Sequence, residues 1–188
     1  MHTLTSFSMS FVARALAALA LTAAAGAQAH VVLEDQAALA GRSYKAVFKV
    51  GHGCDGAPTT AISVRLPAGF RGAKPMPKPG WTLRVERAPL ATPYDDHGKR
   101  VTEDVTLISW TASGKDQWLA DGWYDEFVLQ GGLPSEARPL WFKVLQTCDN
   151  TSANWDEVPA NGTSTKGLKR PAALLELIPS EQAGGHQH

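Results

Sequence analysis

Three side chains in this sequence have the chemistry of a metal site: His30, His52 and Trp155. His30 follows Ala27-Gln28-Ala29, a small-x-small pattern of the kind that signal peptidases cleave. A histidine at a free N-terminus offers two donors, the α-amine and the imidazole Nδ1, which close a chelate ring on one metal ion. Cu(II) favours nitrogen donors arranged in one plane, and it binds such ligands more tightly than the other divalent first-row metal ions do. Cleavage after Ala29 therefore creates a copper ligand that the precursor lacks.

The segment before His30, residues 1–29, has the layout of a secretory signal peptide. A polar start with Arg14 precedes an apolar run from Ala15 to Ala25. This run is shorter than the roughly 20 residues of a membrane-spanning helix, so we expect cleavage rather than an uncleaved anchor. A rival cut after Ala27 would leave Gln28 as the first residue. Cleavage after Ala29 predicts a periplasmic or secreted protein.

Two cysteines, Cys54 and Cys148, are expected to form a disulfide, because an exported protein matures in an oxidising compartment. They are far apart and do not form a C-x-x-C motif, which argues against thioredoxin-like redox chemistry. His52 lies on a glycine-rich loop just before Cys54, and Trp155 follows Cys148. The disulfide therefore predicts that the His52 and Trp155 loops meet at one end of the fold, where the first strand can also begin.

Each candidate ligand also has a simpler interpretation. His30 can be no more than the residue after the cut, His52 a turn histidine, and Trp155 a cover for the disulfide. The indole nitrogen of tryptophan donates only, so we expect Trp155 to shield or stack on the copper ion rather than to bind it.

The remaining polar residues are weaker candidates. Asp156 and Glu157 are expected as loop charges, with outer-shell hydrogen bonds to an imidazole as the alternative. His97 fits a hairpin turn, and His186 and His188 fit a solvated tail that could bind metal only loosely. The three methionines form no Met-rich Cu(I) motif, so Cu(II) is the preferred ion.

Strands are expected to position these residues. Apolar and polar side chains alternate with a period of two, which is typical of β-structure. The predicted strands are Ser43–Val50, Thr60–Pro67, Trp81–Arg87, Val101–Trp110, Glu126–Gln130, Leu140–Gln146 and Ala172–Ile178. The predicted turns lie at 51–58, 73–81, 95–99, 131–134 and 161–167. Seven or eight short strands predict an all-β protein, a single antiparallel β-sandwich of cupredoxin-like or immunoglobulin-like type over residues 30–179, with a polar tail at 180–188.

Five stretches together resemble the YcnI-like family of exported copper-binding domains: "HVVLE" at 30–34, "HGCDGAPT" at 52–59, "PKPGW" at 77–81, "YDEF" at 124–127 and "QTCDN…NWDEVP" at 146–159. The family is described as a cupredoxin-like sandwich that binds Cu(II) through a variant of the histidine brace, with a carboxylate and a tryptophan beside the metal. The resemblance assigns the N-terminal ligand to His30 and the tryptophan to Trp155. The loop that holds the family's glutamate contains His52 here, with Asp55 as its only carboxylate, so we infer that His52 replaces the glutamate.

The resulting prediction is a Cu(II)-binding protein that buffers copper or passes it to other copper-handling proteins of the periplasm or membrane, and not an enzyme. One alternative is a copper-dependent oxidative enzyme, since lytic polysaccharide monooxygenases also begin with a brace histidine; another is a metal-free structural sandwich. The six tryptophans mostly fit strand patterns and form no aromatic row for a polysaccharide. Basic and acidic residues balance at 18 each, which argues against nucleic acid or an anionic membrane as a partner.

Overall fold

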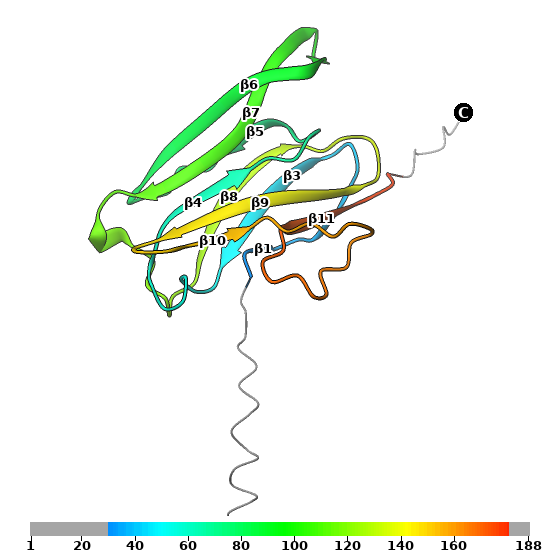
Figure 1. The fold of residues 1–188 in the computed structure, drawn as a ribbon. Helices are drawn as coiled ribbons and strands as arrows, with labels where there is room; N and C mark the ends of the chain where they lie inside the picture. Colours follow the sequence, from blue (N-terminus) through cyan, green and yellow to red (C-terminus); the bar gives the residue numbers. More distant parts are fainter. Residues whose placement is uncertain (1–29, 181–188) are drawn as a thin grey trace, which may run out of the picture.

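The computed structural model describes residues 30–180 (Figure 1). The predicted signal peptide, the predicted cleavage sites and the histidines of the tail lie outside the described residues. Within 30–180 the only helix is one 3-10 turn, Lys115–Gln117, and no helix there could span a membrane. The strands are β1 (Val32–Leu33), β2 (Ala37–Leu39), β3 (Ser43–Val50), β4 (Thr59–Arg65), β5 (Arg71–Pro75), β6 (Trp81–Asp96), β7 (Lys99–Ala112), β8 (Asp125–Gly132), β9 (Pro139–Cys148), β10 (Ser152–Trp155) and β11 (Ala173–Ile178).

These strands form two sheets packed face to face. The smaller sheet has the order β1-β3-β8-β5, and the larger has the order β2-β11-β9-β4-β7-β6. Strand β10 also pairs with β9, and it does so at the opposite end of β9 from β11. All ladders are antiparallel except that between β11 and β2, which is parallel. The predicted all-β sandwich is therefore confirmed, with one parallel pair at its edge.

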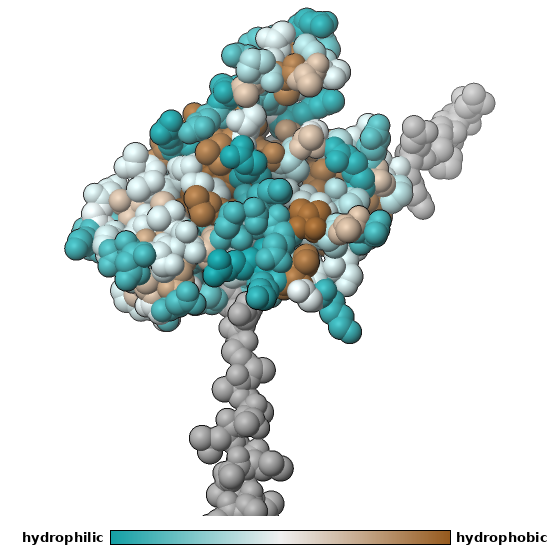
Figure 2. Space-filling view, viewed as in Figure 1, coloured by the Kyte–Doolittle hydropathy of each residue, from teal (hydrophilic) through white to brown (hydrophobic). Residues whose placement is uncertain are grey.

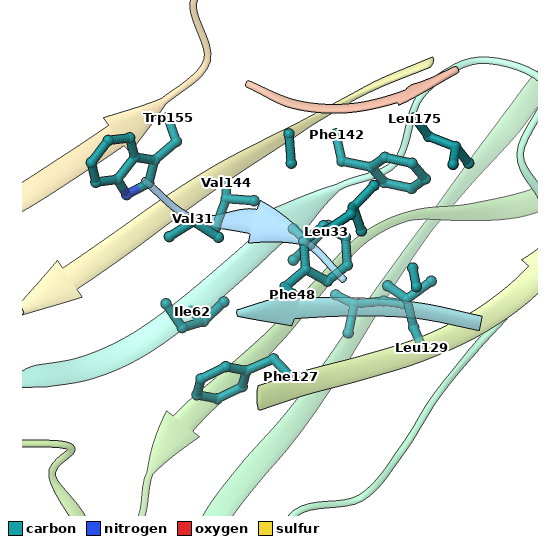
Figure 3. Close-up of a cluster of buried hydrophobic side chains, with 14 of the residues drawn as sticks. Val31, Leu33, Phe48, Ile62, Phe127, Leu129, Phe142, Val144, Trp155 and Leu175 are labelled. Atoms are coloured by element: carbon teal, nitrogen blue, oxygen red, sulfur yellow. The ribbon is translucent and has the colours of Figure 1, made fainter. Parts of the chain in front are cut away.

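Alternation of apolar and polar residues accounts for the core. In β9 the inward-facing residues Leu140, Phe142 and Val144 are at most 1% exposed, whereas the intervening Lys143 is exposed. Figure 3 shows side chains from both sheets meeting between the layers. Complete burial of each large apolar side chain stabilises the fold by about 1.5–3 kcal/mol, so this interior is the main source of stability.

The hairpin of β6 and β7 extends beyond the sandwich (Figure 1). Its turn is His97-Gly98, and both residues have positive φ, 52° and 82°, as a type I′ turn requires. His97 is therefore a hairpin-turn residue, as predicted. Asp104, which is 4% exposed, ties the hairpin to the sandwich by accepting hydrogen bonds from the Gly72 N–H at 2.9 Å and the Tyr94 hydroxyl at 2.8 Å.

Two strands lie where the sequence predicted turns or loops. β5 occupies part of the segment 73–81, and its proline, Pro75, is tolerated because β5 is an edge strand that pairs only with β8. β10 places Trp155 in a strand rather than a loop, because its four residues pair with Val144–Thr147 of β9.

Among the tryptophans, Trp123 differs in being 65% exposed. Figure 2 shows hydrophilic and hydrophobic residues interspersed over the viewed face.

Candidate metal centre

The predicted disulfide between Cys54 and Cys148 is present, with 6.0 Å between the Cα atoms. Both cysteines are buried, 5% and 3% exposed, at the end of the sandwich where β3 leads into β4. The loop that carries Cys54 is a tight turn closed by two hydrogen bonds, from Cys54 N to Ala57 O and from Ala57 N to Cys54 O. The disulfide therefore joins the His52 loop to the last residue of β9.

A glycine is needed next to His52. A Cβ atom on Gly53 would lie 1.9 Å from the carbonyl oxygen of Ala57, closer than any real contact. The Gly53 N–H donates to Oδ1 of Asp121 at 3.0 Å, which holds the loop from the other side. The loop that presents His52 is thus constrained by a disulfide, by the tight turn and by Asp121.

A buried glutamine that the sequence analysis did not single out connects the two predicted loops. Gln146 is 1% exposed, and its Oε1 accepts a hydrogen bond from the Trp155 indole N–H at 3.0 Å. Its Nε2 donates to the His52 carbonyl at 2.8 Å and to the Thr59 hydroxyl at 2.7 Å. A signal existed in the sequence, because Gln146 occupies an inward-facing position in the alternation of β9, where the other residues are apolar.

His30 lies against Trp155. Their ring centroids are 5.5 Å apart and the ring planes are nearly perpendicular, at 85°. Trp155 is only 4% exposed because β10 places it on the same inner face as Val144, its partner in β9. Figure 3 shows Trp155 at one end of the buried cluster. Two residues 125 positions apart in the sequence are therefore in contact.

The register of β1 shows which end of the smaller sheet His30 occupies. Val32 pairs with Lys49 and Leu33 with Phe48, and the Glu34 N–H donates to the Val47 carbonyl. This ladder ends at Val32 and Lys49, two residues from His30 in one strand and two residues from Gly51 in the other. Gly51 directly precedes His52, so His30 and the His52 loop share one end of the smaller sheet.

The ring of His52 is half-buried, and its Nδ1 is hydrogen-bonded to the carbonyl oxygen of Gly53. Because a carbonyl oxygen only accepts, the proton of the neutral imidazole is on Nδ1 and Nε2 keeps its lone pair. This is the tautomer that a metal-binding histidine needs when its other nitrogen is hydrogen-bonded to the backbone. His52 thus has one nitrogen free to bind a metal.

Two of the neighbouring carboxylates, Asp156 and Glu157, bind local donors. Asp156 accepts a hydrogen bond from the Asn154 side chain at 2.8 Å, and Glu157 accepts one from the Lys169 backbone N–H at 2.9 Å. Asp55 is exposed in the turn and has a positive φ of 51°. These interactions shape the loops on either side of the site.

Within residues 30–180, no group of three or more His, Cys, Asp or Glu side chains could hold a metal ion. A metal centre made from His30 and His52 therefore needs a further donor, and the backbone nitrogen of His30 becomes one when residue 30 is the first of the chain. With that nitrogen, an amine and two imidazoles would form a nitrogen donor set of the kind that Cu(II) prefers.

Comparison with known proteins agrees with the fold. A crystal structure of an uncharacterized protein from Nocardia farcinica, described as revealing an immunoglobulin-like fold, superposes with a TM-score of 0.60. It is 29% identical in sequence, and the match covers 79% of this chain and 97% of that one. No curated protein matches the chain. The family described as "Domain of unknown function (DUF1775)" matches residues 30–177, and the chain belongs to this family, that of the YcnI-like domains.

Proposed function

We propose that the protein binds Cu(II) in the periplasm or outside the cell and buffers copper or transfers it to other copper-handling proteins, without catalysing a reaction. The observation that carries the proposal is the contact of His30 with Trp155 at the end of the sandwich to which the disulfide ties the His52 loop. The export of the protein and its cleavage before His30 are parts of the same proposal.

In the mature protein, His30 would supply the α-amine and Nδ1, and His52 would supply Nε2. The amine has a reference pKa of about 7.7–8.0, so a tightly bound metal ion displaces its proton near neutral pH. The His52 ring is suited to this role because its Nδ1 is already hydrogen-bonded to Gly53. Copper bound in this way would link β1 to the loop after β3.

Trp155 contributes by excluding water rather than by binding the metal. Its indole N–H is occupied by Gln146 and its ring is almost entirely buried. The tryptophan therefore covers one side of the His30 imidazole and limits the positions that this ring can adopt. A fixed imidazole loses less conformational entropy when it binds a metal ion.

Two matched forms of the protein test the proposal. One begins at His30, and the other carries a single additional alanine before it. We expect the extended form to bind Cu(II) at least about tenfold more weakly, because it loses the amine and its chelate ring. Circular dichroism should show the same fold for both forms. Equal affinities would mean that the amine is not a ligand, and the proposed site would be wrong.

The second ligand is tested by EPR of the copper-loaded protein. His52→Ala should change the copper hyperfine pattern and remove one coordinated nitrogen, whereas His97→Ala, in the hairpin turn, should leave the spectrum unchanged. An unchanged spectrum for His52→Ala would contradict the assignment. A processed protein that binds no Cu(II) would refute the proposed function as a whole.

A further inference from the structure

An open pocket of about 550 Å³ lies beside His30, between the start of β1 and the start of β11. The loop between β10 and β11, residues 156–172 (Figure 1, orange), contributes part of its lining. Glu157 closes the base of this loop, because its N–H donates to the Arg170 carbonyl and its own carbonyl accepts from the Ala172 N–H. The loop is thus anchored next to Trp155, and residues 163–166 of it line the pocket.

Half of the residues that line the pocket are polar, and one of them, Lys166, carries a positive charge. Three successive hydroxyl side chains and an ammonium group come from the loop, and the imidazole of His30 and the amide of Gln36 come from the N-terminal segment. The loop residues are Thr163, Ser164, Thr165 and Lys166. No Asp or Glu is among the residues that line the pocket, although 18 acidic residues occur in the chain. Such a lining favours an anion.

The edges of two strands add backbone donors. The Glu34 N–H faces β3, so the alternation of an antiparallel ladder directs the Val31 N–H to the opposite edge of β1. The same alternation applies to β11. The Leu177 N–H donates to the Arg138 carbonyl on the side of β9, and the Glu176 N–H donates to the Gln36 carbonyl on the other side. Leu174 lies two residues before Glu176, so its N–H also faces away from β9. Val31 and Leu174 both line the pocket.

We propose that this pocket binds a small carboxylate anion next to the metal held by His30, with the Lys166 ammonium and the Leu174 N–H as its main partners. The anion site is inferred from the pocket alone, whereas contact between the anion and copper rests on the proposed function. A dicarboxylate such as oxalate is small enough for the pocket and can bind Lys166 with one carboxylate and the metal with the other. The protein would then accept copper as a carboxylate complex.

The first test uses the mature, metal-free protein and sodium oxalate at constant ionic strength, followed by amide NMR shifts. We expect saturable shifts at Val31, Leu174 and Thr163–Lys166. Lys166→Gln should weaken oxalate binding about tenfold, the size of one charge-assisted hydrogen bond. The matched control is Lys169→Gln, which removes the same charge from the same loop but does not line the pocket; its affinity should stay within about twofold.

The same spectra report whether each variant is folded, and Lys166→Arg should retain the binding. Shifts that do not saturate, or equal weakening by Lys166→Gln and Lys169→Gln, would refute the anion site. The second test adds oxalate to the copper-loaded protein, where the EPR spectrum should change for the wild type and much less for Lys166→Gln. If the protein binds oxalate but no copper, the proposed function is refuted and the anion site remains. If the protein binds copper but Lys166→Gln changes neither oxalate binding nor the EPR response to oxalate, the anion site alone is refuted.

Discussion

The glutamine between the two loops of the candidate site offers a sharp test of how the site is held. Gln146, Trp155 and Thr59 are 1%, 4% and 0% exposed. The Gln146 amide makes three hydrogen bonds, to the Trp155 indole, the His52 carbonyl and the Thr59 hydroxyl. Gln146→Leu keeps a side chain of similar size but leaves all three groups without this partner.

The expected loss follows from the burial of these groups. A buried polar group left without a partner costs about 1–3 kcal/mol. The Thr59 hydroxyl can rotate and the His52 carbonyl is partly buried, so the indole N–H carries most of the cost and we expect a total of about 2–4 kcal/mol. In a domain of this size, the melting temperature should then fall by roughly 5–15 °C.

Gln146→Glu separates hydrogen bonding from packing, because its side chain has the same shape. The carboxylate can accept from the indole but cannot donate to the His52 carbonyl, whereas the protonated acid can. Burial raises the pKa of this carboxyl above its usual value of about 4.3, so the folded state binds more protons than the unfolded chain. Its unfolding free energy should therefore decrease as the pH rises from about 4 to 7.

Urea unfolding of the mature protein, followed by tryptophan fluorescence and circular dichroism, measures both effects. Gln130→Leu and Gln130→Glu are the matched controls, since Gln130 is exposed on β8 and each should change stability by no more than about 0.5 kcal/mol. A Gln146→Leu variant as stable as the wild type, or a Gln146→Glu variant with the same pH dependence as Gln130→Glu, would refute the reasoning.

Three further predictions concern stability. Replacing both Cys54 and Cys148 by serine should lower the unfolding free energy by about 4–5 kcal/mol, because the disulfide closes a loop with a sequence separation of 94; a urea midpoint equal to that of the oxidised protein would contradict this. Asp104→Ala should loosen the β6–β7 hairpin at a cost of about 2–4 kcal/mol, seen as faster amide exchange in the hairpin than in β9, and uniform exchange would count against it. Burial, together with a hydrogen bond to Asp104, raises the pKa of Tyr94 to about 12, and a hydrogen bond to Glu126 raises that of Tyr124 to about 12. The folded state therefore keeps protons that the unfolded chain loses, and its stability should fall as the pH rises from about 10 to 12; absorbance titration that shows phenolate near pH 10 in the folded protein would contradict both shifts.

Local patterns in the sequence were enough to predict the class of fold and several of its strands. The strand predicted from the alternation in Ser43–Val50 has the same bounds as β3, because successive side chains of a strand point to opposite faces whatever the strand pairs with. The turn at His97 and Gly98 and the pairing of Cys54 with Cys148 are also local or compositional inferences. The turn depends on residue type and on the few residues around it, and the disulfide on the presence of only two cysteines in the chain.

The strands that were missed depend on their neighbours. β10 is only four residues long and becomes a strand by pairing with β9, and β5 is an edge strand that contains a proline. Neither carries an alternation long enough to be recognised in isolation. The long hairpin likewise extends farther than its apolar pattern, because cross-strand hydrogen bonds continue where side chains no longer pack on the core.

The sequence by itself determined which residues could bind a metal: a histidine that cleavage can expose, a second histidine on a loop, and the cysteines that restrain that loop. Only the tertiary structure decided that the ring of His30 contacts Trp155, that Gln146 bridges Trp155 and His52, and that a pocket adjoins His30. The physical reason is that donor chemistry belongs to single residues. Contacts between residues up to 125 positions apart arise instead from the pairing of distant strands, and a one-dimensional pattern does not contain that pairing.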